Sequence, residues 1–153
     1  MCKNALRKVV ETYIRKTPWH GAVFNARVIC GRLPQQIADI FEMSDRNIWA
    51  NTRALKHIYD KRTAEEFDFI CGDLSEMFHD PDAVYRNKTD KRGHFGILKR
   101  YGDLSYFVSV ELMSSDLKKP VMELVTVFRT RDRRYLNDYD LLWSRRDGAT
   151  RSS

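Results

Sequence analysis

The sequence predicts one α+β domain in which N-terminal helices pack on a four-stranded antiparallel sheet. The chain has 153 residues, 42% hydrophobic and 31% charged, which suits a single core of ordinary size. Hydrophobic residues recur mainly at helical spacing before Pro81 and at a spacing of two after it. Helices followed by a run of strands with short connections are typical of the α+β class.

The first part of the chain alternates helical and extended segments. Residues 3–16 place their hydrophobic side chains on one helical face, and Pro18 ends that helix. Residues 22–30 alternate as a strand does, and Pro34 suits the first turn of a short helix. A short extended piece over residues 47–50 leads into the next helix.

Two further helices have recognisable N-terminal caps. Asn51 is a suitable N-cap for a helix with a stripe formed by Leu55, Ile58 and Tyr59. Thr63 and Glu66 match a capping box at the start of a helix that runs to His79. We expect the hydrophobic stripe of this second helix to pack on one face of the sheet.

After Pro81 the pattern predicts an antiparallel meander. Its four strands are expected at residues 83–86, 94–100, 104–112 and 120–130. Short polar links between them favour antiparallel neighbours. The hydrophobic residues of 132–143 fit a closing helix.

We divide the chain into a lead, a main domain and a tail. Residues 1–48 form a helix–strand–helix lead that packs on the same core as the rest. Residues 49–143 form the predicted catalytic domain, and the polar residues 144–153 form a disordered tail.

The sequence has no signal for secretion or for membrane insertion. Charges interrupt the first 16 residues, and no hydrophobic stretch approaches the length of a membrane span. Cys2, Cys30 and Cys71 are too far apart for a structural zinc site. We expect free thiols in a reducing, cytoplasmic setting, and no metal or cofactor.

The charge of the chain is strongly uneven. Lys and Arg number 27 and Asp and Glu 21, which gives a formal net charge of +6. Residues 63–82 hold seven acids and no Lys or Arg, so the rest of the chain has 27 bases against 14 acids, or +13. Such a surface attracts polyanions. A basic face that only improves solubility is the alternative.

Several common enzyme classes lack their motifs here. The chain has no GxxxxGK[ST] loop, no GxGxxG after a strand, no HExxH and no GxSxG. These absences argue against P-loop hydrolases, dinucleotide enzymes, zinc proteases and serine hydrolases.

The residues most suggestive of chemistry lie around His57. Histidine exchanges protons near neutral pH, and here it stands between Lys56 and Lys61 in a basic helical segment. An exposed histidine among ordinary surface charges is the alternative. Further residues could contact RNA by charge, hydrogen bonding or stacking: Lys56, Lys61, Arg92, His94, Arg100, Arg131 and Tyr135.

Three segments carry a resemblance to a known family. They are residues 28–41 (VICGRLPQQIADIF), 55–62 (LKHIYDKR) and 74–85 (LSEMFHDPDAVY), followed by strands. Together they resemble a phage-associated branch of the barnase/EndoU/colicin/RelE-like (BECR) ribonuclease superfamily. The resemblance implies a metal-independent, toxin-type endoribonuclease that cleaves RNA by attack of the ribose 2′-hydroxyl. It also implies RNA, including tRNA, as substrate and a cognate antitoxin or immunity protein as partner.

The resemblance assigns site residues with one departure from the family pattern. His57 matches the first histidine, and Arg62 stands where a second histidine is often found. Arg can hold a phosphate but does not readily exchange protons. Lys99, Thr126 and Arg129 complete the expected catalytic set by position and chemistry.

Two other functions remain open at this point. One is a nucleic-acid-binding module of the same fold without catalysis, and the other is a phage or protein-interaction component. We also expect the acidic helix Thr63–His79 to lie away from the surface formed by Lys99 and Arg129, because its carboxylates would repel phosphate.

Overall fold

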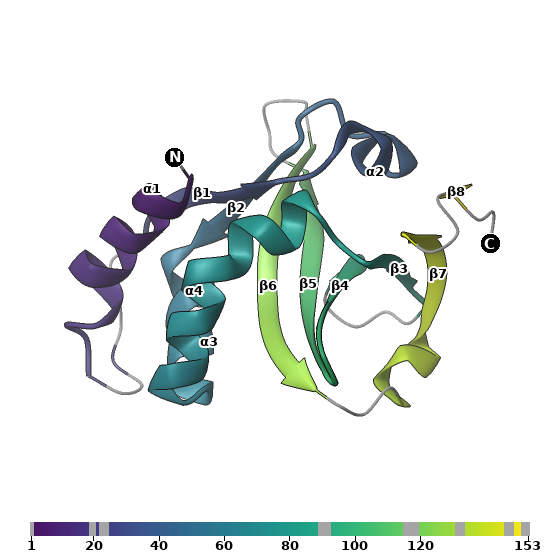
Figure 1. The fold of residues 1–153 in the computed structure, drawn as a ribbon. Helices are drawn as coiled ribbons and strands as arrows, with labels where there is room; N and C mark the ends of the chain where they lie inside the picture. The colour runs from purple at the N-terminus through teal and green to yellow at the C-terminus, as the bar shows by residue number, and fades with distance from the viewer. Residues whose placement is uncertain are drawn as a thin grey trace.

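The fold is a single mixed β-sheet with helices against one of its faces (Figure 1). It is taken from a computed structural model. The structure describes residues 2–18, 21, 25–88, 93–114, 120–130, 134–145 and 149–150.

Eight strands form this sheet in the order β1-β2-β6-β5-β4-β3-β7-β8. Their bounds are β1 Arg27–Arg32, β2 Asn47–Asn51, β3 Ala83–Asn87, β4 Phe95–Tyr101, β5 Leu104–Ser114, β6 Pro120–Thr130, β7 Tyr139–Ser144 and β8 Ala149–Thr150. Neighbouring strands in the described sheet are antiparallel, except that β2 and β6 are parallel.

The predicted four-stranded antiparallel sheet is therefore wrong. The meander β3–β6 exists and forms the middle of the sheet, but four more strands extend it, two on each side. One of the added contacts, between β2 and β6, is parallel. β2 was expected only as a short extended piece, because nothing local in the sequence indicates which strand it pairs with.

The predicted helix over 132–143 is also wrong. A 3₁₀ turn, η2 (Arg134–Asp138), is followed by strand β7, which pairs with β3 through Asn87↔Tyr139 and Tyr85↔Leu141. Leu142 and Trp143 are consecutive and both buried. A short hydrophobic run of this kind fits a buried strand as well as a helix, so periodicity does not distinguish them.

The helices begin where the sequence predicts. α3 (Thr52–Lys61) is capped by Asn51, whose side-chain oxygen accepts a hydrogen bond from Ala54 N at 2.8 Å. α4 (Ala64–His79) is capped by the Thr63 hydroxyl, which accepts from Glu66 N at 3.1 Å. The other helical elements are α1 (Cys2–Val9), a π-helical turn η1 (Val10–Ile14) and α2 (Gln35–Ile40). None of the described helices is long and apolar enough to cross a membrane.

The main core lies between α4 and the sheet, as the hydrophobic stripe predicts. α4 crosses in front of the sheet in Figure 1, and α1 lies beside it against β1. The buried α4 residues are Phe67, Ile70, Leu74, Met77 and Phe78. Gly31 leaves room for Phe78, since a Cβ at Gly31 would lie 2.4 Å from its ring. Residues of α1, β1 and β6 belong to one hydrophobic cluster, so the N-terminal lead shares the core of the chain.

The described residues cover the opposite face of the sheet only in part. Ala83, Leu98 and Phe107 form a second buried cluster beneath residues of η2 and β7. Gly96 admits the Phe107 ring, because a Cβ there would lie 2.0 Å from that ring. Toward β2 and β6 the same face carries polar side chains and the half-buried Trp49. This part of the face adjoins the site described next.

Candidate nucleic-acid interface

Helix α3 lies along the part of β6 that β2 leaves unpaired. β2 pairs with β6 only at Ile48↔Met122 and Trp49↔Glu123, and the chain then turns at Asn51 into α3. At the far end of this helix, Arg62 Nε donates to the Val127 carbonyl at 3.0 Å. α3 therefore protects the strand edge and places its outer face beside β6.

A hollow of about 560 Å³ opens between α3 and β6. Its lining residues are Asn51, Arg53, Ala54, His57, Val125 and Thr126. The sequence prediction named two of them, His57 and Thr126, and the fold brings these two together. His57 is exposed, as its position off the buried stripe of α3 predicts. The hollow thus combines an imidazole, a hydroxyl and a guanidinium.

A second hollow of about 640 Å³ lies next to the first. It is lined by Asn25, Ala26, Arg27, Trp49, Asn51 and Glu123. Asn51 borders both hollows, and its Nδ2 donates to Glu123 Oε1 at 3.0 Å while its side-chain oxygen caps α3. The N-cap residue of α3 therefore fixes one carboxylate oxygen of Glu123 at the boundary between the two hollows.

Glu123 is a candidate site residue that the sequence analysis did not name. It is half-buried on β6, and directly across the sheet it faces Glu111 of β5. A sequence signal existed, since Glu123 is the one carboxylate within the hydrophobic run of residues 120–130. Its significance depends on Asn51, from which it is separated by 72 positions, and this contact is not visible in the sequence.

The predicted catalytic cations Arg62, Lys99 and Arg129 are not among the residues that line the hollow beside His57. Lys99 Nζ donates to the Asp80 carbonyl at 2.6 Å and lies 3.3 Å from Asp80 Oδ2. Arg129 and Arg62 each lie 3.5 Å from a carboxylate oxygen of Glu66. The structure does not place Lys99 or Arg129 in the His57 hollow.

The acidic helix therefore lies against the residues from which it was expected to be separated. Strand register puts Lys99 and Arg129 opposite Tyr106, on the face that α4 covers. Glu66 at the start of α4 and Asp80 at its end pair with these two cations. The predicted separation is wrong, because the carboxylates of this helix neutralise cations of the same chain.

The predicted RNA-contacting residues occupy different environments. Lys56 is buried and pairs with Asp60, whereas Lys61 and Arg100 are exposed. The exposed His94 accepts a hydrogen bond at Nδ1 from Leu112 N at 2.9 Å. Arg92 and Arg131 lie outside the described residues, and only the backbone of Tyr135 is described, within η2.

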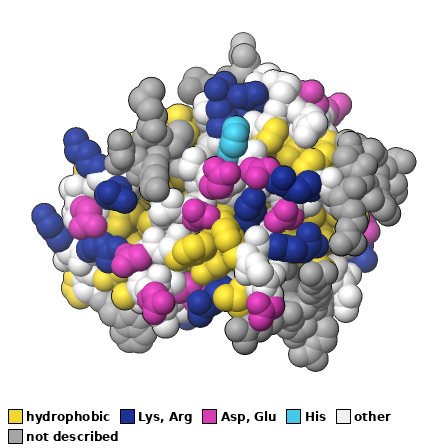
Figure 2. Space-filling model, viewed as in Figure 1, with side chains coloured by type: hydrophobic (Ala, Val, Ile, Leu, Met, Phe, Trp, Pro, Cys, Tyr) yellow, Lys and Arg dark blue, Asp and Glu magenta, His cyan; other side chains and the backbone are white. Residues whose placement is uncertain are grey.

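Charges on the helix-covered face are largely paired with one another. Figure 2 shows acidic and basic side chains interspersed over this face. Burial by itself raises the pKa of Asp80, but bonds from Arg145 and Lys99 outweigh burial and hold the pKa below its ordinary value. Burial also raises the pKa of the Tyr101 hydroxyl, and its hydrogen bond to Asp73 raises it further. This face is therefore a poor site for phosphate.

Comparison with known proteins does not identify a family for this chain. No protein-family model matches it, and no match was found among curated proteins or solved structures. The resemblance to BECR ribonucleases therefore stays a prediction that rests on the three sequence segments.

Proposed function

We propose that the chain is an endoribonuclease that cleaves single-stranded RNA where the hollow between α3 and β6 meets the hollow lined by Glu123, at Asn51. The observation that carries this proposal is the joining of the His57 and Glu123 environments through Asn51. Cleavage by 2′-hydroxyl attack needs one group that accepts a proton and one that donates a proton. Glu123 supplies the second proton-transfer group that Arg62 could not.

The reaction divides between these two residues. Glu123 accepts the proton of the ribose 2′-hydroxyl, and the freed oxygen bonds to the adjacent phosphorus. The bond from phosphorus to the 5′ oxygen breaks, and His57 in its protonated form gives a proton to that leaving oxygen. The products are a 2′,3′-cyclic phosphate and a 5′-hydroxyl end.

Three neighbouring side chains support these steps. Arg53 stabilises the negative charge that develops on the phosphorane, and the Thr126 hydroxyl donates to a phosphate oxygen. Asn51 is a positioning residue, since its bond to Glu123 Oε1 leaves the other carboxylate oxygen for the 2′-hydroxyl. No step uses a metal, so we expect cleavage to persist in excess EDTA.

The decisive experiment replaces His57 with Ala. His57 is exposed and lies off the buried stripe of α3, so the substitution should change the free energy of unfolding by at most about 0.5 kcal/mol. Loss of a positioned proton donor should lower the cleavage rate by roughly 10²–10⁴-fold. Glu123→Gln should lower it similarly, because an amide does not accept the proton.

His79→Ala and Glu76→Gln are the matched controls. Both residues are exposed on α4, away from the hollow, and both variants should cleave RNA at the rate of the unmodified protein. Equal cleavage by His57→Ala and His79→Ala would remove His57 from the mechanism.

Nucleic-acid binding without cleavage is the second candidate function. The pairing of Lys99, Arg129 and Arg62 within the chain favours it, because three expected catalytic cations are already engaged. The end groups of incubated RNA separate the two functions. Cyclic phosphate ends support cleavage, whereas bound but intact RNA supports the binding module.

A further inference from the structure

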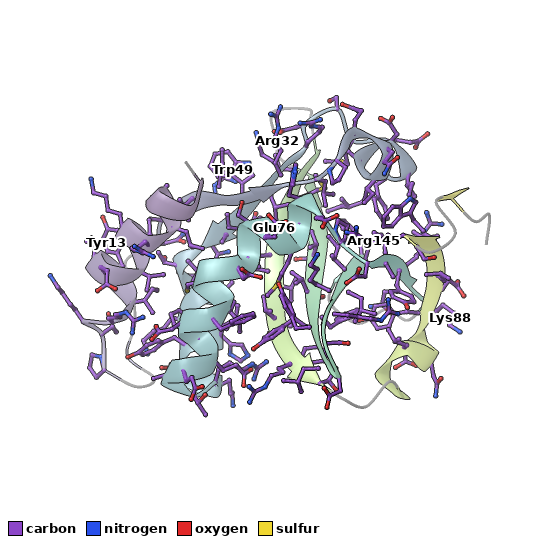
Figure 3. All side chains as sticks on the ribbon, viewed as in Figure 1. Tyr13, Arg32, Trp49, Glu76, Lys88 and Arg145 are labelled. Carbon is purple, nitrogen blue, oxygen red and sulfur yellow. The ribbon has the colours of Figure 1, made fainter. Side chains whose placement is uncertain are left out.

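The hollow beside Glu123 contains an aromatic surface that the proposed cleavage does not use. Trp49 is half-buried on β2, and the Arg27 guanidinium lies over its ring at 4.8 Å from the ring centroid. Both side chains line the hollow of about 640 Å³. Figure 3 shows Trp49 beside the β1–β2 pair.

The fold holds this pair in place without burying it. Trp49 lies opposite Ile29 in β1, and Arg27 lies opposite Asn51 in β2, so both belong to the same face of the sheet. The main core instead takes the alternate residues Val28, Ile48 and Ala50. Trp49 is therefore fixed by its strand while its ring borders the hollow.

A flat apolar ring with a cation beside it suits one kind of ligand in particular. Unpaired nucleobases stack on aromatic rings and on guanidinium planes, and their phosphates attract the same cation. The volume of the hollow is enough for one nucleoside. A base inside a duplex is stacked and paired already, so it cannot enter.

We propose that the Trp49–Arg27 hollow is a subsite for one unpaired nucleobase of an RNA strand. The base stacks against the Trp49–Arg27 pair, and the strand continues past Asn51 toward Arg53 and His57. The path of the RNA strand toward His57 rests on the proposed function. The subsite itself concerns binding alone and would restrict the protein to single-stranded RNA.

The test measures binding without cleavage. A short, fluorescein-labelled single strand of 2′-O-methyl RNA lacks the attacking hydroxyl, so its affinity can be measured by anisotropy. Trp49→Leu should weaken binding by roughly 5- to 150-fold, the usual effect of removing one stacking ring. Trp49→Phe keeps a ring and should bind within a few-fold of the unmodified protein. The duplex of the same strand should bind both variants equally.

A second pair of variants keeps the test decisive if Trp49→Leu is unstable. Arg27→Gln and Arg86→Gln each remove one exposed strand arginine, but β3, which carries Arg86, lies four strands from β2. Arg27→Gln should weaken binding of the single strand several-fold more than Arg86→Gln. Equal losses from these two variants, or unchanged binding by a folded Trp49→Leu variant, would overturn the subsite. If the subsite holds but natural RNA is not cleaved, only the proposed function fails.

Discussion

The cations on the two sides of this sheet are in opposite situations. On the face covered by α4, Lys99 and Arg129 pair with carboxylates from the two ends of that helix. At the hollows beside β2 and β6, Arg27 lies over a tryptophan ring and Arg53 lines the space near His57. Within the part of the chain that the structure describes, no carboxylate pairs with Arg27 or Arg53.

This difference shows what a count of basic residues does not reveal. The seven acids of residues 63–82 include Glu66 and Asp80, which neutralise cations of the same chain. Among the described cations, Arg27 and Arg53 pair with no carboxylate and are those that we expect to stay available for a polyanion. Net charge thus predicts the kind of ligand, whereas pairing decides where it binds.

The largest effect on stability should come from breaking a buried ion pair inside the protein. Lys56 and Asp60 are both nearly inaccessible to solvent, with side chains 5% and 6% exposed. Asp60→Asn leaves the buried ammonium without its counter-charge and should lower the free energy of unfolding by about 3 kcal/mol. Urea denaturation measures this change.

Asp103→Asn is the matched control, because Asp103 is exposed in the turn between β4 and β5. It should change the unfolding free energy by at most about 0.5 kcal/mol. Similar losses of unfolding free energy for the two variants would mean that the buried Lys56 does not need the charge of Asp60.

An intermediate effect should distinguish the two groups of cations directly. Arg53→Gln should lower the affinity for single-stranded RNA several-fold and reduce the slope of log affinity against log salt by about 0.7. Arg129→Gln removes the same charge from the helix-covered face, so its slope should stay that of the unmodified protein. Equal slopes for the two variants would contradict the division into paired and available cations.

The smallest effect should appear at acidic pH. Because the pKa of Asp80 is lowered in the folded state, its bonds to Arg145 and Lys99 stabilise the fold above the ordinary Asp pKa of about 3.9. That stabilisation is lost as the pH falls through the lowered value. The Asp80 side chain is 44% exposed, so Asp80→Asn should lower the free energy of unfolding by at most about 1 kcal/mol at neutral pH.

Denaturation of both proteins between pH 7 and pH 2 checks this expectation. The difference between them should shrink as the pH falls from about 4 through the lowered pKa of folded Asp80, since Asp80 is protonated first in the unfolded protein and only then in the folded protein. A difference that stays constant over this range would show that Asp80 acts without its charge.

Local sequence signals predicted much of this fold. The caps at Asn51 and Thr63 and the meander of β3 to β6 follow from side-chain type and spacing. They did not predict strand β7, because the consecutive buried residues Leu142 and Trp143 fit a helix as well as a strand. The parallel pairing of β2 with β6 joins distant segments, and no residue within either strand indicates its partner.

The residues of the candidate site also divide into those that local sequence signals predict and those that depend on distant contacts. His57 was found because a histidine in a basic helical segment is informative by itself, and Thr126 was found by its place on a strand. Glu123 and Trp49 were missed because their meaning depends on contacts across the sheet. Lys56 was assigned to RNA from its neighbours in sequence, whereas tertiary packing buries it.

The short pairing between β2 and β6 also bears on the dynamics of the molecule. Two residue pairs and the Asn51–Glu123 hydrogen bond join the N-terminal strands to the meander at this point. β5 and β6, in contrast, pair along almost their whole length. Amide protons at the β2–β6 contact should therefore exchange through local opening well before those between β5 and β6. Each such opening would part Trp49 and Asn51 from Glu123 and Thr126, so the proposed site would exist only while this contact is closed.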